Sequence, residues 1–294
     1  GWRGRPALRG HRSGKSVSNH FSIVKHEATK DSFTARFADK LSGLELSIDY
    51  QLDQHGILTV QSTIKNVAEG DYQLEQLLNW LPLPTQADEV LDFFGHHCKE
   101  RQPQRYPITY GLTTREGFEG RSGHDFTITQ IALNQSTNFR SGEAWSFAVA
   151  WSGNNVNHIE KLVDDNLSIG GGEYLLPGEV ILKSGESYST PKVIACYSAN
   201  GLDEITNKHY SHLRSRKNHP KSERPVNLNL WEAVYFDHNF EKLSKIIEKA
   251  AEVGVERVVL DDGWFGARRS DKAGLGDWVV SKAVWPQGLK PLAD

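Results

Sequence analysis

The stretch VERVVLDDGWFGARR, residues 255–269, decides how the C-terminal part of the chain folds. Residues 255–260 have the apolar character of a buried strand, and this strand ends abruptly in Asp261, Asp262 and Gly263. The upstream segment VNLNLW, residues 226–231, is typical of a second short strand. The two strands begin about thirty residues apart, which is the length of one βαβ unit.

A helix is expected between these two strands. Asn239 can cap its first turn, and Gly254 stands where a C-terminal glycine belongs. Its apolar stripe consists of Phe240, Leu243, Ile246, Ile247 and Ala250. A crossover of this length predicts parallel strands. Residues 226–294 therefore open an α/β domain, and because a closed (β/α)8 barrel takes about 250 residues, we expect an incomplete barrel and a chain that is a fragment at both ends.

The preceding part of the chain has the two-residue period of strands, from about residue 32 to residue 198. Segments such as SFTARFAD, LELSIDYQL, ILTVQSTIKNV and WSFAVAWSG alternate apolar and polar positions, with turn residues between them. Short strands at intervals of roughly ten residues predict antiparallel sheets packed face to face. The expected fold class is multidomain, a large antiparallel β-sandwich followed by the first βα units of a barrel.

A change of period marks the end of the sandwich. After Gly201, the residues Leu202, Ile205, His209 and Leu213 fall on one side of a helix. The segment RKNHPKSERP, residues 216–225, then breaks the pattern with two prolines and dense charge. We therefore predict a sandwich domain in residues 1–200, a helix and linker in 201–225, and the start of the barrel in 226–294.

Residues 92–125 interrupt the strand pattern and are expected to form a long irregular excursion. The segment is polar and rich in Gly and Pro, yet it carries five aromatic side chains that disfavour disorder: Phe93, Phe94, Tyr106, Tyr110 and Phe118. We expect an ordered loop that contacts another surface.

Composition limits the classes of partner and cofactor. A net charge of −3 gives no electrostatic reason to expect nucleic acid or an anionic membrane as a partner, and no apolar segment is long enough to span a bilayer. His96, His97 and Cys98 are consecutive, so their side chains cannot converge on one ion from a regular strand, and no metal site is predicted. The two cysteines, Cys98 and Cys196, do not form a disulfide framework, which favours a reducing compartment such as the cytoplasm.

The candidate functional residues stand where the two parallel strands end, because α/β folds place working side chains there. They are Trp231, Asp261, Asp262 and Trp264. A carboxylate accepts hydrogen bonds from neighbouring hydroxyls and an indole offers an apolar face, which together suit a pyranose ring. Adjacent strand residues point to opposite sides, so one aspartate is expected to line a pocket and the other either to hold the loop or to reach around the rim. The alternatives are that the Asp pair only caps turns and that Trp231 packs in the core.

The segments LNLWEAVYFDHN and GVERVVLDDGWFGARRSDKAGLGDWVVSKAVWPQGLKPL resemble the start of the catalytic barrel in α-galactosidases of glycoside hydrolase family 36. Upstream, GHHCKERQPQR, GRSGHD, GEAWSFAVAWSGN and GGGEYLLPGEV resemble the N-terminal β-supersandwich of the bacterial branch of that family. The resemblance implies a hydrolase that removes terminal α-linked galactose from oligosaccharides such as raffinose and melibiose, with retention by double displacement.

The resemblance also implies roles for individual residues. Trp231 would border the galactose pocket, Asp261 and Asp262 would bind sugar hydroxyls at carbons 4 and 6, and Trp264 would shape the same pocket. The family places its catalytic aspartates on later strands, and the Lys-Trp-Asp type of motif that carries the nucleophile does not occur here. No catalytic residue is therefore assigned within the chain. The nucleophile and the acid/base are expected beyond Asp294, and the chain alone is predicted to be inactive.

No cofactor is implied, and family members assemble as homo-oligomers, often tetramers, for which the aromatic segment 93–118 is the candidate contact. Two other functions are compatible with the sequence. One is a non-catalytic carbohydrate-binding β-sandwich with an appended α/β segment. The other is a related enzyme, a transglycosidase of the raffinose-synthase type or an α-N-acetylgalactosaminidase.

Overall fold

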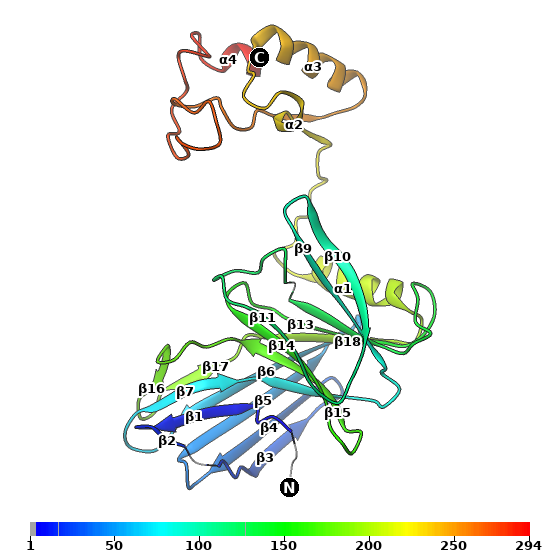
Figure 1. Ribbon diagram of the computed structural model, residues 1–294, viewed down its shortest axis with the longest axis vertical. Coiled ribbons are helices and arrows are strands. Elements are labelled where there is room, and N and C mark those ends of the chain that lie inside the picture. The colour runs from blue at the N-terminus through cyan, green and yellow to red at the C-terminus, as the bar shows by residue number, and fades with distance from the viewer. Residues whose placement is uncertain (1–3, 17, 127) are drawn as a thin grey trace. The chain divides into compact units, whose positions relative to one another are not determined.

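The computed structural model describes residues 4–294 except residues 17 and 127. The chain forms two compact units, residues 1–219 and residues 220–294, and each is described by itself (Figure 1).

A ten-stranded antiparallel sheet is the framework of the first unit. Its strand order is β10-β9-β12-β13-β18-β6-β5-β4-β3, and β17 pairs with β6. The strands are β3 (Ser22–Ala28), β4 (Ser32–Asp39), β5 (Leu44–Leu52), β6 (Ile57–Asn66), β9 (Glu89–His96), β10 (Lys99–Pro107), β12 (Thr129–Leu133), β13 (Ala144–Val149), β17 (Ser187–Ser189) and β18 (Val193–Ser198).

Two four-stranded antiparallel sheets complete the β-structure of this unit. One has the order β16-β7-β1-β2, with β1 (Leu8–Arg12), β2 (Lys15–Ser16), β7 (Tyr72–Leu77) and β16 (Val180–Leu182). The other has the order β11-β14-β15-β8, with β8 (Asn79–Leu83), β11 (Gly111–Gly117), β14 (Asn155–Lys161) and β15 (Leu167–Glu173).

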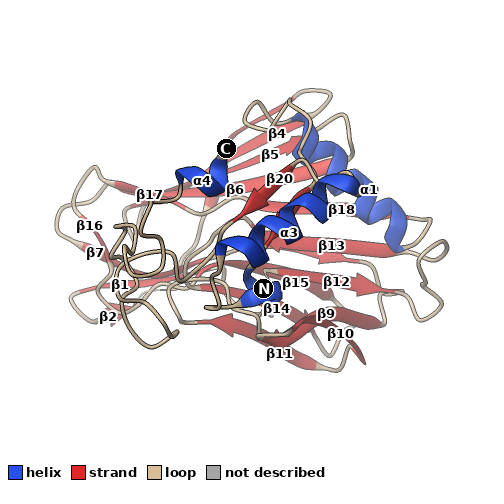
Figure 2. Ribbon diagram, turned by 90° about the horizontal axis from the view of Figure 1, so that it is seen from above, coloured by secondary structure: helices blue, strands red, loops and turns tan. Residues whose placement is uncertain are grey.

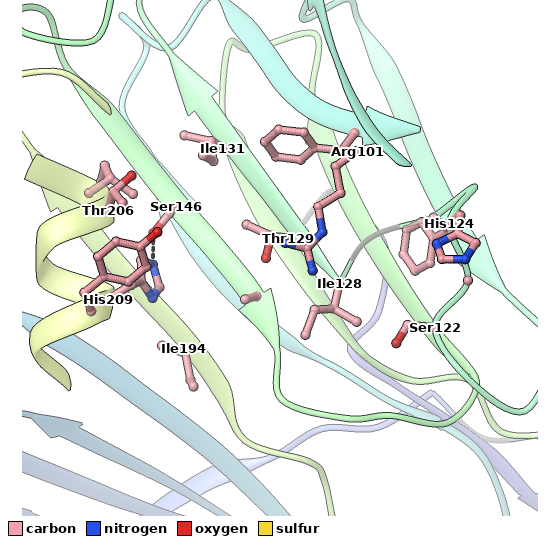
Figure 3. A pocket seen from close by; sticks show the side chains of 16 residues that line it. Arg101, Ser122, His124, Ile128, Thr129, Ile131, Ser146, Ile194, Thr206 and His209 are labelled. Carbon is pink, nitrogen blue, oxygen red and sulfur yellow. Dashed lines mark hydrogen bonds between the residues drawn. The ribbon is translucent and has the colours of Figure 1, made fainter. Parts of the chain in front are cut away.

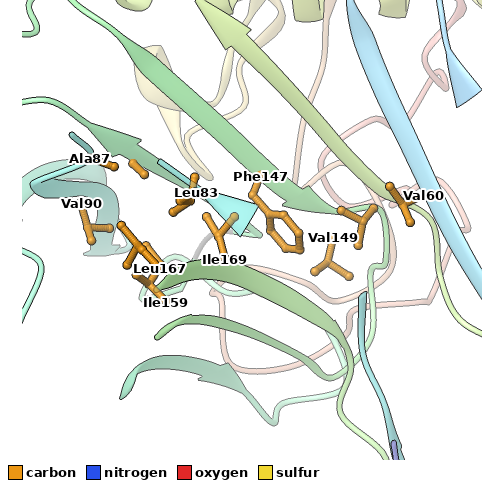
Figure 4. Close-up of a cluster of buried hydrophobic side chains, with 11 residues drawn as sticks. Val60, Leu83, Ala87, Val90, Phe147, Val149, Ile159, Leu167 and Ile169 are labelled. Atoms are coloured by element: carbon orange, nitrogen blue, oxygen red, sulfur yellow. The ribbon is translucent and has the colours of Figure 1, made fainter. Parts of the chain in front are cut away.

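Both small sheets pack on the same face of the large one. Val60 and Ile64 alternate with their neighbours along β6 and so point to one side. Val60 belongs to a cluster with Phe147 and Ile159 between the large sheet and the β11-β14-β15-β8 sheet (Figure 4). Ile64 belongs to a second cluster, with Leu74 and Leu182 of the other small sheet. The sheet-on-sheet architecture predicted from the alternating pattern is confirmed.

Helix α1 (Leu202–Ser215) covers the opposite face of the large sheet (Figure 2). Its residues Leu202 and Ile205 pack against Ile57 and Cys196, which point away from the sandwich interior. His212 of α1 also lies 2.7 Å from the carboxylate of Asp53, measured from Nδ1 to Oδ2. The predicted helix is confirmed, and it belongs to the same compact unit as the sheets.

The prediction of an irregular excursion over residues 92–125 was wrong. Most of the segment is β-structure, because β9 and β10 form a hairpin and β11 pairs with β14. Pro103 and Pro107 argued against a strand, but β10 is the edge strand of the sheet, where a residue that lacks an N–H is tolerated. The hairpin turn contains Cys98 at a positive φ of 67°.

The second unit contains a parallel strand pair joined by a helix. Its elements are β19 (Asn227–Asn229), α2 (Trp231–Val234), α3 (Phe240–Glu252), β20 (Arg257–Val259) and α4 (Lys290–Ala293). Leu228 is in register with Val258, and the pairing is parallel as predicted. The side chain of Asn239 caps α3 by accepting a hydrogen bond from the Lys242 N–H at 3.1 Å. Gly254 follows the helix at a φ of +88°.

Trp231 was expected in the first strand but begins the short helix α2 instead. The side chain of Asn229 accepts a hydrogen bond from the Trp231 N–H at 2.8 Å, which turns the chain as soon as the strand ends. The core of the second unit includes Leu230 and Val234, which flank this turn, together with Leu243 and Trp285.

No helix in the described part of the chain is both long enough and apolar enough to cross a membrane.

Candidate functional site

The carboxyl ends of β19 and β20 are joined by side-chain hydrogen bonds. Asn229 donates from Nδ2 to Oδ2 of Asp261 at 2.5 Å, and Oδ1 of Asp261 accepts the Asp262 N–H at 2.7 Å. Both oxygens of Asp261 are thus engaged by the protein. Asn229 was not among the residues selected from the sequence, although strand alternation places it at the strand end on the face opposite to Leu228 and Leu230.

Asp262 holds the loop that follows β20. Its Oδ1 accepts hydrogen bonds from Arg268 Nε at 2.5 Å and from the Gly263 N–H at 2.9 Å. The Arg268 guanidinium keeps the pKa of Asp262 below its ordinary value, so the carboxylate is ionised at neutral pH. Among the described residues, Oδ2 of Asp262 has no hydrogen-bond partner.

Arg268 is itself fixed by the protein. Its side chain is 7% exposed, and one guanidinium nitrogen donates to the carbonyl of Ala273 at 2.7 Å. The guanidinium also lies over the ring of Phe236, 5.8 Å from the ring centroid. Arg268 was not among the residues selected from the sequence. Its ion pair with Asp262 performs the loop-holding role that was expected of one of the two aspartates.

Phe236 connects this ion pair to Trp231. The rings of Trp231 and Phe236 meet edge to face with centroids 5.0 Å apart, and Tyr235 makes a similar contact with Trp231 at 5.2 Å. Gly263 permits the close approach, since a Cβ there would lie 2.8 Å from the Phe236 ring. Its φ of +90° is also one that favours glycine. Trp231, Asp261 and Asp262 therefore belong to one contiguous network.

Trp264 lies in a different aromatic group. Its ring is 5.0 Å from Phe265 and 6.4 Å from Trp278, and it packs against the core of the second unit. Within the described chain, no hydrogen bond or ring contact joins Trp264 to the other three predicted residues. The structure thus brings together three of the four.

Half-buried His238 lies beside the same turn. A Cβ at Gly263 would come within 3.5 Å of its ring, and burial lowers the pKa of His238, so the imidazole is neutral at pH 7. His238 was not predicted from the sequence, because its position beside Gly263 depends on how the turns after β19 and β20 approach each other.

The cavities found in the described chain are lined by other residues. A hollow of about 570 Å³ in the second unit has apolar walls that include Leu230, Ile247 and Leu289. In the first unit, a cavity of about 750 Å³ lies beside α1, and Arg101 extends into it opposite Ser146 and His209 (Figure 3). Those last two are hydrogen bonded at 3.0 Å. Trp231, Asp261 and Asp262 therefore form an ordered group at the strand ends, called the aspartate rim, and they do not line either of these cavities.

No group of three or more His, Cys, Asp or Glu side chains suited to a metal ion was found in the parts of the chain that the structure describes.

Comparison with known proteins places the chain in a family. The model of the glycosyl hydrolase family 36 N-terminal domain matches residues 1–183, and the melibiase model matches residues 187–294. An alpha-galactosidase of Escherichia coli is 35% identical over 289 residues, which cover 98% of this chain and 41% of that protein. An alpha-galactosidase of Lactobacillus acidophilus is 33% identical, with coverages of 93% and 38%.

Solved structures agree with this result. The family 36 alpha-galactosidase AgaA from Geobacillus stearothermophilus superposes with a TM-score of 0.87 at 29% identity, covering 99% of this chain and 44% of that one. A variant of the same enzyme has been solved in complex with raffinose. The chain spans about 40% of the length of the relatives it matches. The chain belongs to glycosyl hydrolase family 36.

Proposed function

We propose that the protein carrying this chain is an α-galactosidase that hydrolyses terminal α-linked galactose from oligosaccharides of the raffinose and melibiose type, with retention. Family membership and the names of the relatives support this activity. Complexes of AgaA variants with raffinose and stachyose support the substrate class. The observation that carries the proposal is the pair of carboxylates, Asp261 and Asp262, that follows β20 and is hydrogen bonded to the end of the parallel strand β19.

Asp262 has the clearest role in substrate binding. Its Oδ1 is held by Arg268 and the backbone, so the carboxylate is oriented before any ligand arrives. Its Oδ2 remains able to accept hydrogen bonds from a sugar hydroxyl, and a charged acceptor strengthens such a bond. Asp261 positions the neighbouring strand end through Asn229 and offers the other side of its carboxylate to a second hydroxyl.

Trp231 and Trp264 would provide apolar surface for the faces of the pyranose ring. Trp231 is fixed by Phe236 and Tyr235, so its ring is oriented without the ligand. Trp264 packs with Trp278 in the loop that follows β20, and we propose that it shapes the same sugar-binding site.

Neither aspartate is proposed as a catalytic group. Retention requires two carboxyl groups about 5 to 5.5 Å apart, one acting as nucleophile and one as acid/base. Asp261 has both oxygens in hydrogen bonds, and Arg268 stabilises the ionised form of Asp262, which opposes a role as proton donor. We propose that the catalytic pair comes from residues outside this chain.

Two assays test the activity. The full-length protein is incubated with p-nitrophenyl α-galactoside and the first product anomer is followed by proton NMR, where the α-anomer of galactose is expected before mutarotation. The 294-residue chain alone is expected to give no turnover. Release of the β-anomer would contradict retention, and turnover by the chain alone would contradict the assignment of the catalytic pair.

The assembly and location of the protein are also proposals. We propose a homotetramer with the segment 93–118 at a subunit contact, which size-exclusion chromatography with light scattering tests on the full-length protein.

We propose a cytoplasmic location because Cys98 is an exposed free thiol and Cys196 is a buried one. Cell fractionation with detection of the protein tests this location.

A further inference from the structure

The glycine run GGGE, residues 170–173, lies in β15 of the first unit and has a structural role that the proposed activity does not require. Thr114, His158, Gly170 and Trp80 form one row across β11, β14, β15 and β8. Because Gly170 has no side chain, the Trp80 indole extends over β15 and stacks on His158, with centroids 5.7 Å apart and planes 10° apart. A Cβ at Gly170 would lie 2.4 Å from the indole.

This stack fixes His158 in the wall of a cavity of about 420 Å³. His158 is only 5% exposed, and its Nδ1 lies 3.1 Å from the hydroxyl of Thr114. Its other ring nitrogen has no hydrogen-bond partner among the described residues. Burial, together with the charges of Arg5 and Arg9, lowers the pKa of His158 to about 4, so the ring is neutral at pH 7 and can exchange hydrogen bonds with an uncharged group.

Charged side chains of both signs surround the mouth of this cavity. They are Arg5, Arg9, Glu75, Glu116 and Glu173. In the described chain, the guanidinium groups of Arg5 and Arg9 and the carboxylate of Glu116 make no hydrogen bond or ion pair with protein groups. Rim charges that neutralise one another would be paired, whereas these three keep their capacity to bind a ligand.

The balance of charge indicates the class of ligand. Two cations and three carboxylates give no strong preference for an anion or a cation, but they provide both donors and acceptors. Tyr174, which is held edge to face by Phe118 at 4.6 Å, adds an aromatic surface to the same wall. The volume lies within the range of about 300 to 1,000 Å³ that is usual for small-molecule pockets.

We propose that this cavity binds a neutral saccharide unit, whose hydroxyls pair with the guanidinium and carboxylate groups of the rim and with the open nitrogen of His158. The site belongs to the β-sandwich unit and needs no residue of the aspartate rim. It would hold an oligosaccharide on the protein without cleaving it.

Isothermal titration of the 294-residue chain with melibiose tests the proposal, with saturation-transfer NMR as a second readout. We expect saturable binding in the wild type. Arg9→Gln and Glu116→Gln change exposed side chains and should leave the fold intact, and each is expected to weaken binding about tenfold because a charge-assisted hydrogen bond is lost. Arg36→Gln, an exposed arginine on β4, is the matched control and is expected to leave the affinity unchanged.

Asp262→Asn separates this site from the aspartate rim. If the cavity binds melibiose, saturable binding remains in Asp262→Asn, which removes only the contribution of the aspartate rim, whereas Arg9→Gln and Glu116→Gln weaken the binding. Loss of binding in Asp262→Asn with retention in the two cavity variants would overturn the proposal and assign the sugar to the second unit. Absence of both heat and saturation transfer in the wild-type chain would overturn it as well, without bearing on the proposed hydrolysis.

Discussion

Two regions of the molecule carry polar groups on a sheet, and they differ in whether these groups are hydrogen bonded to other protein groups. At the ends of β19 and β20, Asn229, Asp261, Asp262 and Arg268 bond to one another and to the backbone. On the β11-β14-β15-β8 sheet, His158 is stacked and buried, yet it keeps an open ring nitrogen beside unpaired rim charges. The first arrangement orients charged groups before a ligand binds, and the second leaves several groups free to bind one. The following changes separate the two.

The largest expected effect is a pH dependence of stability that originates at His158. The pKa of His158 is about 4 in the folded state, against an ordinary value of 6.5. As the pH falls, His158 is therefore protonated in the unfolded chain before it is protonated in the folded one. The contribution of His158 is therefore constant above pH 6.5 and is lost as the pH falls toward 4. The total is about 3 kcal/mol, at about 1.4 kcal/mol per pH unit.

Urea unfolding of the wild type and of His158→Gln between pH 4 and pH 7 measures this term, because the slopes from all other groups cancel in the difference. The wild type is expected to lose more stability than the variant over this range. Parallel curves would show that His158 is not buried as a neutral ring.

A Cβ at Gly170 should disrupt the stack of Trp80 on His158 on the β11-β14-β15-β8 sheet and leave the ends of β19 and β20 unaffected. In Gly170→Ala the new atom would lie 2.4 Å from the indole of Trp80 and 2.9 Å from the carbonyl of Asn79. Overpacking of this kind costs about 2 kcal/mol, and displacement of the ring should change its fluorescence. Denaturant unfolding followed by tryptophan emission measures both quantities.

Gly172→Ala is the matched control on the same strand, since its Cβ would come no nearer than 3.0 Å to the side chain of Leu78 and 3.2 Å to the carbonyl of Leu77. The smaller crowding should have a smaller effect on stability and leave the stack of Trp80 on His158 intact. Equal effects of the two substitutions would contradict the role assigned to Gly170.

Removal of the Arg268 guanidinium should weaken the hydrogen-bond network at the ends of β19 and β20. In Arg268→Met, Asp262 loses its ion-pair partner at a position where its side chain is 16% exposed, which should cost about 1.5 kcal/mol. The pKa of Asp262 should rise, because the Arg268 hydrogen bond is the largest cause of its low value. Carbon-detected NMR titration of the carboxylate measures the pKa. A pKa unchanged from wild type would mean that the ion pair does not form in solution.

The helix cap provides the smallest effect and touches neither region. Asn239→Ala removes the side-chain acceptor for the Lys242 N–H and should destabilise α3 by about 1 kcal/mol. Hydrogen exchange of the α3 amides should report this change while the strands of the first unit keep their protection. Increased exchange in β14 or β15 would show that the two units do not unfold independently.

Patterns that are local in sequence predicted most of the architecture. The two-residue period from residue 32 onward indicated the sandwich, and the spacing of two strands around the stripe of Leu243 and Ala250 indicated the parallel pair. The strand-end aspartates could be selected because they follow an apolar run directly. The edge strand β10 was missed because its prolines oppose a strand in isolation, and only its place at the sheet edge makes them acceptable.

Side-chain partnerships between distant segments were not predictable. Asn229 binds Asp261, and Trp80 stacks on His158 across Gly170, only because strand register brings these residues together. Likewise, the helical start at Trp231 depends on one hydrogen bond that the Trp231 N–H donates to the side chain of Asn229. Alternation assigns a residue to a face of a strand, but the register between strands decides which residues meet.

The kinetic effect of Asp262→Asn on the full-length protein tests the central claim most directly, which is that the strand-end carboxylates hold the galactose ring. With p-nitrophenyl α-galactoside as substrate, kcat/KM is predicted to fall about ten- to a hundredfold, since a charge-assisted hydrogen bond to the sugar is weakened. The unfolding midpoint should change little because the neutral amide keeps an oxygen for the Arg268 Nε–H. Unchanged kcat and KM in a folded variant would contradict the claim.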